Sequence, residues 1–141
     1  MSRVVPIERP LLGALEALAL EVGLGTILLG DMLAGDPAYG RRLLERTCQR
    51  LTYWHWHPEL ARIIPRVRSA AASLREVRDK LAPLPLERVL ENPDAHAFLA
   101  KCHGEVDDLR CDLVAWIYEI KEGRTPTFTP GSYARVSQAR V

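Results

Sequence analysis

The sequence has few of the residues that build covalently or metal-stabilised scaffolds. Its three cysteines, Cys48, Cys102 and Cys111, are odd in number and form no Cys-x-x-Cys pair. This argues against a disulfide framework and a cysteine-rich zinc site, and we expect a reducing compartment, the cytoplasm. The N-terminus lacks a charged region that leads into a short apolar core and a cleavage site, so no secretory signal is predicted.

Signals for β-structure and for phosphate loops are also missing. No segment alternates between apolar and polar residues, no Asn-Gly or Asp-Gly hairpin turn occurs, and no glycine-rich phosphate loop carries a lysine. The net charge of +1 gives no overall attraction to nucleic acid or membranes. With 141 residues, 48% of them apolar and 26% charged, the chain has the size and composition of one globular domain.

The most apolar stretch, Leu11–Gly30, is long enough to suggest a membrane span. Glu16 and Glu21 lie inside it, and each would cost about 2.5–3.5 kcal/mol near the centre of a bilayer. Its glycines weaken a helix by about 1 kcal/mol each relative to alanine, so packing must hold it. We therefore expect no membrane contact and a helix buried at the centre of the fold.

Prolines and glycines divide the chain into helical segments. Asp36-Pro37 and Asn92-Pro93 each place an N-cap residue before a proline at the first helical position. Pro65 should kink or split the third helix, and Gly123 follows the end of the last one. The predicted helices cover about 10–34, 37–55, 57–81, 86–91 and 93–122.

The last predicted helix has the most regular hydrophobic pattern. Its apolar residues alternate steps of four and three, a 3.5-residue repeat. They are Ala95, Leu99, Cys102, Val106, Leu109, Leu113, Trp116 and Ile120. We predict an all-α fold, an antiparallel bundle of four long helices plus one short helix, in a domain covering residues 1–123. Residues 124–141 hold two prolines, three arginines and no acid, which predicts an extended or disordered basic tail.

Positive charge is concentrated in residues 41–80, which hold ten basic and four acidic side chains, a balance of +6. On a helical wheel, Leu44, Cys48 and Leu51 share one face of the second helix. Arginines at four-residue steps lie opposite, with aromatic residues beside them. Such a face can contact a phosphate backbone and stack on unpaired bases. The predicted nucleic-acid-binding residues are Arg42, Arg46, Arg50, Tyr53, Trp56, His57, Arg62 and Arg66.

Two alternatives for this arginine face stay open: an acidic protein partner, and an ordinary solvated helix surface. On the third helix, Arg62, Arg66, Arg68 and Arg75 add charge but divide between the two sides of its apolar stripe.

Other chemistry-bearing groups give weaker signals. His96, His103 and Asp107 share one flank of the last helix, but a metal site needs three or four converging ligands, so we predict no metal and no cofactor. The E-x-x-D pairs Glu76/Asp79 and Glu105/Asp108 are similar to the magnesium-binding pairs of MazG-type nucleotide pyrophosphatases. That family also has an upstream E-x-x-E, which this chain lacks, so a solvated helix face is the interpretation retained.

Arg50 with His55 or His57 resembles the Arg-x4–6-His motif of the HEPN ribonucleases. The resemblance implies an RNA-cleaving enzyme or toxin in which this pair activates the ribose 2′-hydroxyl and steadies the phosphate. Leu51 departs from the polar residue that usually follows the family's arginine.

In size, helix content and charge layout, residues 10–122 resemble the small helical subunit of class 1 CRISPR ribonucleoprotein complexes, which serve antiviral defence. The resemblance implies a non-catalytic adaptor that contacts RNA or single-stranded DNA and binds other protein subunits or itself. The HEPN-like ribonuclease is the first alternative. A phage or other structural assembly protein without nucleic-acid contact is the second.

Overall fold

The computed structural model describes residues 8–36, 40–52, 54, 58–81 and 83–139; within these ranges, the side chains of residues 8, 9, 40–42, 59 and 137–139 are also left undescribed. The described part is all-α and contains no strand, which confirms the predicted fold class. The elements are α1 (Glu8–Leu33), α2 (Gly40–Thr52), the 3-10 helix η1 (Pro58–Arg62), α3 (Ile64–Lys80), α4 (Leu86–Glu91), α5 (Pro93–Lys121) and α6 (Ser132–Ala139).

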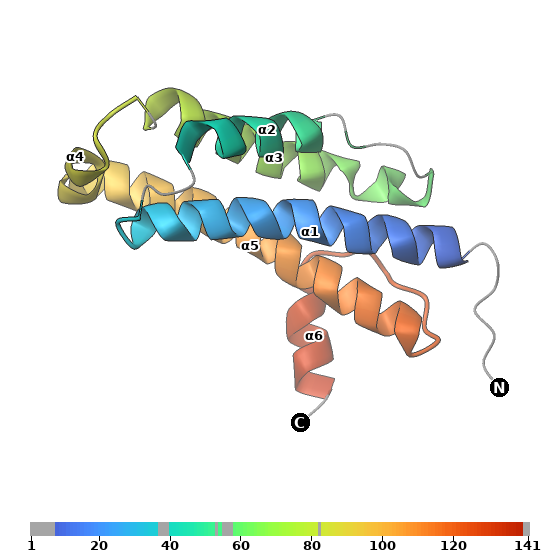
Figure 1. The fold of residues 1–141 in the computed structure, drawn as a ribbon. Coiled ribbons are helices and arrows are strands. Elements are labelled where there is room, and N and C mark those ends of the chain that lie inside the picture. Colours follow the sequence, from blue (N-terminus) through green and yellow to red (C-terminus); the bar gives the residue numbers. More distant parts are fainter. Residues whose placement is uncertain (1–7, 37–39, 53, 55–57, 82, 140–141) are drawn as a thin grey trace.

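The four long helices form an up-and-down bundle in two layers, α1 with α5 and α2 with α3 (Figure 1). Gly23 of α1 lies beside Arg110 of α5, whereas Gly30 lies beside His103, so these two helices are antiparallel. Bundle helices connected in this order need only short connections, and α4 closes one end.

The bundle core is built on the regular stripe of α5. Of the eight residues predicted there, seven are buried and Ala95 is partly buried. Trp116 and Leu113 are completely buried, as are Val67 and Leu74 on α3. The 3.5-residue repeat therefore marked the side of α5 that faces its neighbours.

Three helix boundaries lie where the sequence predicts them, whereas the predicted first helical residue Pro37 lies outside the described residues and the described part of α2 begins at Gly40. Pro65 lies in the first turn of α3, after η1, so the expected split occurs there. The side chain of Asn92 accepts hydrogen bonds from the backbone N–H groups of Asp94 and Ala95, which satisfies two donors at the start of α5. Gly123 ends α5 with a φ of +78°, a left-handed conformation that glycine adopts without strain.

Gly25 shows why α1 tolerates glycine. A Cβ at this position would lie 3.1 Å from Leu74 Cδ1 of α3 and 3.5 Å from Val106 Cγ1 of α5. The missing side chain lets three helices meet at one level of the core.

The expected central burial of α1 is wrong for one side of this helix. Leu20 is 77% exposed and Ile27 is 57% exposed. By length and composition alone, Pro10–Leu33 could span a membrane. Only 39% of its most apolar stretch is buried inside the bundle. In a bundle each helix contacts two neighbours, so an apolar helix keeps one apolar face outside.

The chain after Gly123 also differs from expectation. Over residues 124–131 it follows α5 without regular structure, but Ser132–Ala139 forms α6, packed on α5. Asp112 of α5 supplies the reason. Its side chain is 4% exposed, and its carboxylate accepts hydrogen bonds from the N–H groups of Gly131 and Tyr133, at 3.1 and 2.9 Å. A side chain that is distant in sequence thus caps α6.

Trp116 completes this attachment. Its indole N–H donates to Ser132 Oγ at 2.8 Å, and its ring meets the Phe128 ring edge-on at 5.2 Å between centroids. Phe128 has a φ of +56°, a conformation that costs a bulky residue free energy and persists only where contacts fix it.

Candidate nucleic-acid interface

Three exposed arginines and one half-buried arginine lie on the outer surface of the α2–α3 layer. Arg46 and Arg50 lie one turn apart on α2, and both are exposed. Arg68 and Arg75 of α3 are seven residues apart, close to two turns, so they share one side of their helix. The guanidinium of Arg75 donates to Thr52 Oγ1 at 3.0 Å, which turns this side toward α2. We call Arg46, Arg50, Arg68 and Arg75 the basic face.

Within the described residues, three members of this face have no acidic partner, Arg46, Arg68 and Arg75, and the first two are exposed. Arg50 forms an ion pair: its Nη1 lies 2.7 Å from Oε1 of Glu21 on α1, and half of the arginine side chain is still exposed. Glu21 is only 17% exposed, so this ion pair also holds α1 and α2 together.

The two predicted arginines outside α2 have different environments. Arg62 lies exposed on η1 and has no ion-pair partner among the residues described. Arg66 points away from α2: its Nη1 lies 2.8 Å from the buried Asp112, and its guanidinium lies over the Trp116 ring at 5.8 Å. Its geometry is that of a structural residue, and we remove it from the candidate interface. The predicted division of these arginines between two sides of α3 is confirmed by Arg66 and Arg75.

Four of the predicted residues lie outside what the structure describes. These are the side chain of Arg42 and all of Tyr53, Trp56 and His57. His55, the other histidine of the HEPN-like pair, lies outside it as well, while the guanidinium of Arg50 is bonded to Glu21.

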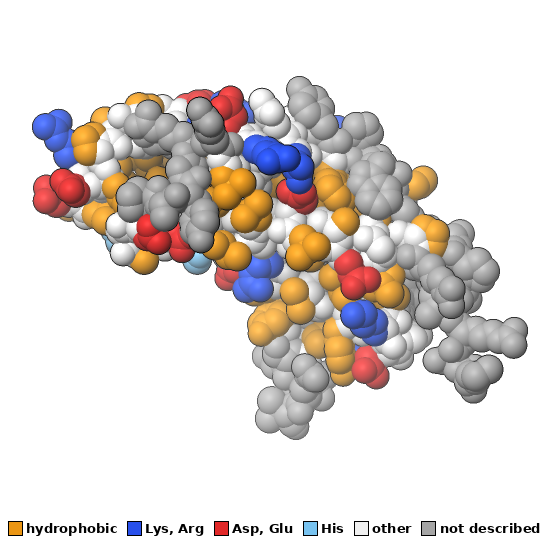
Figure 2. Space-filling view, in the orientation of Figure 1, with side chains coloured by type: hydrophobic (Ala, Val, Ile, Leu, Met, Phe, Trp, Pro, Cys, Tyr) orange, Lys and Arg blue, Asp and Glu red, His pale blue; other side chains and the backbone are white. Residues whose placement is uncertain are grey.

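The opposite layer carries a surface that sequence reasoning missed. We call it the apolar face, made of Leu20, Leu24 and Ile27 on α1 with Val114 and Ile117 on α5. Figure 2 shows hydrophobic side chains recurring over α1 and α5 among scattered charges. An open groove of about 910 Å³ lies there. Its only sequence signal was the excess of apolar residues in α1 over what one buried side can hold.

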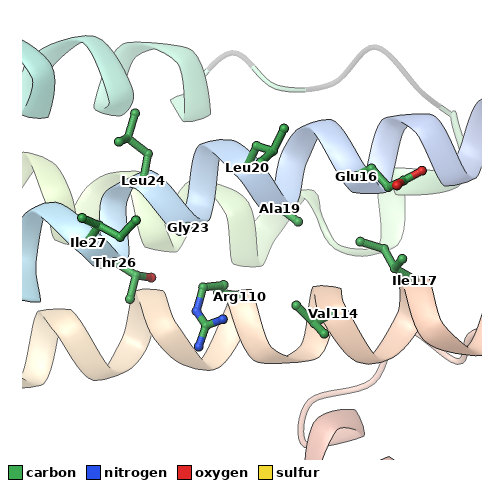
Figure 3. A pocket seen from close by; sticks show the side chains of 10 residues that line it. All are labelled: Glu16, Ala19, Leu20, Gly23, Leu24, Thr26, Ile27, Arg110, Val114 and Ile117. Atoms are coloured by element: carbon green, nitrogen blue, oxygen red, sulfur yellow. The ribbon is translucent and has the colours of Figure 1, made fainter.

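Figure 3 shows the construction of this groove. Val114 and Arg110 project from α5 toward α1, where Ala19 and Gly23 leave room, and Leu20 and Leu24 stand on α1. Two charged pairs flank the apolar residues. Lys121 Nζ lies 3.8 Å from Glu16 Oε2, and Arg110 Nε lies 2.7 Å from Asp107 Oδ1, an ion pair that raises the pKa of Arg110.

No metal centre forms in the described part of the chain, where no group of three or more His, Cys, Asp or Glu side chains could hold an ion. His103 packs against Gly30 instead of joining His96, and Asp107 is bound to Arg110. Of the E-x-x-D residues, Asp79 pairs with Arg78 and Glu105 accepts a hydrogen bond from Ser73.

Cys102 and Cys111 show no activation for nucleophilic chemistry. Burial, followed by the nearby charges of Glu105 and Glu76, raises the pKa of Cys102 to about 11. Burial and Asp107 also raise the pKa of Cys111. Both thiols therefore stay protonated near neutral pH, and reactive cysteines need the opposite shift.

Comparison of the chain with protein-family models, with curated proteins and with solved structures finds no match. The two surfaces themselves are therefore the basis for inferring a function.

Proposed function

We propose that this protein is a non-catalytic helical subunit of a larger cytoplasmic assembly that contacts single-stranded nucleic acid, RNA or DNA, through the basic face. The proposed role resembles that of the small helical subunit of class 1 CRISPR complexes. One observation carries it: Arg46 and Arg68, on neighbouring helices, are exposed and have no acidic partner in the described structure.

The geometry supports a phosphate contact for electrostatic reasons. A guanidinium bonded to a carboxylate has little left for a phosphate, whereas a free one releases condensed counterions when it neutralises a phosphate. Thr52 and Arg75 join the two helices, so the four arginines keep a fixed arrangement. Glu45 is the exposed acid on the same helix as Arg46 and leaves the layer with an excess of positive charge.

The ribonuclease alternative has less support. A HEPN-like mechanism needs a free arginine beside a histidine, and Arg50 is bonded to Glu21. The other alternative is an assembly protein that binds partners through the apolar face and does not contact nucleic acid. The absence of nucleic-acid binding in the experiment below would favour it.

The experiment measures fluorescence anisotropy of a labelled, mixed-sequence single-stranded RNA, and of the matching DNA, titrated with the full chain at several salt concentrations. Arg50 is paired with Glu21, so we count three arginine–phosphate contacts, which predict a slope of log affinity against log salt of about −2.1, or about a 20-fold loss between 50 and 200 mM salt. Arg46→Glu/Arg68→Glu should make the slope shallower, at about −0.7, and weaken binding at every salt concentration.

Arg88→Glu provides the matched control, because Arg88 is an exposed arginine on α4, away from the basic face. It should leave the affinity within about twofold, because salt screens an exposed charge that lies more than a Debye length from the binding site. Equal weakening by Arg88→Glu, or no binding by the wild type, would overturn the proposal. Release of short RNA products that depends on Arg50 would instead favour the ribonuclease.

A further inference from the structure

The apolar face is a surface that folding of one chain leaves uncovered. Leu20, Ile27 and Val114 are 77%, 57% and 43% exposed, and they lie on two adjacent helices. Monomeric proteins rarely expose contiguous apolar surface of this kind, and large exposed patches mark interaction sites.

The charges around the face point to a protein and not to a lipid surface. Helices that lie on membranes have a polar face rich in lysine and arginine. Residues 10–33 hold no lysine or arginine, and the two cations beside the face, Lys121 and Arg110, are each paired with an acid, so the face has no excess of positive charge to attract anionic headgroups.

The same charges fit a second copy of this chain. Acids stand on α1, and cations stand at the α5 side of the groove. Glu16 and Lys121 share one level along the helix pair. Gly23 and Arg110 share the next, where a Cβ on Gly23 would lie 3.8 Å from the arginine Cδ. A two-fold axis parallel to the helices preserves these levels. It would bring Glu16 of each copy toward Lys121 of the partner subunit, and Leu20 toward Val114 of the partner subunit.

The outer surface of the α1–α5 pair, with the apolar face at its centre, has the size that a stable dimer needs. The 24 residues of Pro10–Leu33 extend about 36 Å at 1.5 Å per residue, and two packed helices present a strip about 20 Å wide. The product, about 700 Å² from each copy, is close to the roughly 800 Å² per partner of a standard interface.

We propose that the protein is a homodimer in which α1 of each copy packs antiparallel against α5 of the other, joined through the apolar face. The four helices at the interface form a square, in which each α1 lies between two α5 helices. Ala19 and Gly23 permit the close approach. This inference is independent of the nucleic-acid contact, which uses the opposite layer.

The first test measures the mass of the purified full chain by sedimentation equilibrium between about 1 and 100 μM, a range that covers ordinary dimer affinities. We expect a mass of about 32 kDa, twice 15.8 kDa. Leu20→Glu should raise the dissociation constant at least about 100-fold, since two leucines, each worth roughly tenfold or more, are lost and two carboxylates are desolvated.

Val114→Glu gives a second variant on the other helix, in case Leu20→Glu alters folding. Leu84→Glu is the control: Leu84 is 45% exposed but lies between α3 and α4. This variant should remain a dimer. Circular dichroism should show unchanged helix content for all three.

A charge exchange tests the register. Glu16→Lys and Lys121→Glu should each weaken self-association, because like charges then face each other twice in either homodimer. A mixture of these two variants should form heterodimers, since both cross-subunit contacts become attractive. Each exposed ion pair raises the association constant roughly two- to fivefold. The heterodimer, which has two such pairs, should therefore associate roughly four- to 25-fold more tightly than a dimer with uncharged residues at these positions.

Three results would overturn the proposal. The wild type could be monomeric throughout the concentration range, which would mean that the apolar face does not bind a second copy and would favour a different protein as its partner. Leu20→Glu and Val114→Glu could both remain dimeric, which would place the interface elsewhere. The charge-exchanged variants could mix at random, which would exclude this register. None of these results bears on nucleic-acid binding, whose test depends on Arg46 and Arg68.

Discussion

Replacing Asp112 with alanine should detach α6 and destabilise the bundle. The carboxylate is 4% exposed and accepts three hydrogen bonds, one from Arg66 at 2.8 Å and two from the backbone of residues 131 and 133. Removing one partner of a fully buried ion pair costs 3–5 kcal/mol. Arg66 is 27% exposed and can turn toward water, which reduces its share. The two backbone bonds add about 1 kcal/mol each.

The expected total loss is about 3 kcal/mol. For 141 residues the unfolding entropy is about 0.3 kcal/mol per kelvin, so the melting temperature should fall by about 10 °C. Calorimetry measures this change. Hydrogen exchange should also show that the backbone amides of Ser132–Val136 lose protection before the rest of the chain opens.

Two further variants make the test specific. Asp112→Asn keeps the shape but presents an amide N–H₂ to hydrogen-bond donors, so its loss should approach that of alanine. Asp108→Ala removes an exposed carboxylate from the preceding turn of α5 and should change stability by less than about 0.5 kcal/mol. A melting temperature of Asp112→Ala within about 2 °C of the wild type, or unchanged protection of α6, would refute the reasoning.

Two other predictions concern stability. Because the pKa of Cys102 is raised to about 11 in the folded chain, from near 9, stability should decline between about pH 9 and 11 as the unfolded chain releases this proton. Urea unfolding of Cys102→Ala should show a smaller decline, and equal declines would contradict the argument. Gly13→Ala should stabilise the protein by up to about 1 kcal/mol, since Gly13 is helical and a Cβ there meets nothing within 4 Å. Gly25→Ala should lose that gain because its Cβ would meet Leu74 at 3.1 Å; thermal melts that rank Gly25→Ala equal to Gly13→Ala would show otherwise.

Local and periodic features of the sequence predicted the helices well. Asn92-Pro93, Pro65 and Gly123 act through the backbone geometry of their immediate neighbours, and each does in the structure what was expected. The stripe of α5 was readable because its apolar residues occupy one side only.

Features that depend on distant partners could not be predicted. Capping of α6 comes from Asp112, about twenty residues earlier, and the partner of Arg66 lies 46 residues later. For α1 the difficulty was different. Apolar residues surround this helix on nearly all sides, so no periodicity distinguishes its core side from the exposed Leu20 and Ile27. The interface prediction had the first difficulty too, since only contacts across the fold show that Arg66 is bound to Asp112, whereas Arg46 has no acidic partner among the residues that the structure describes.

The most extensive packing in the bundle joins α1 to α5, the first and last of its long helices, and this order has a consequence during synthesis. Residues 34–121 must all be translated before α1 meets its main neighbour. At 5–20 residues per second, about 4 to 18 s pass before α5 is complete, and until then this apolar helix can pack only against α2 and α3. A nascent chain with such a segment is a substrate for ribosome-associated chaperones, and synonymous codons that slow elongation between α3 and α5 should lower the yield of folded protein.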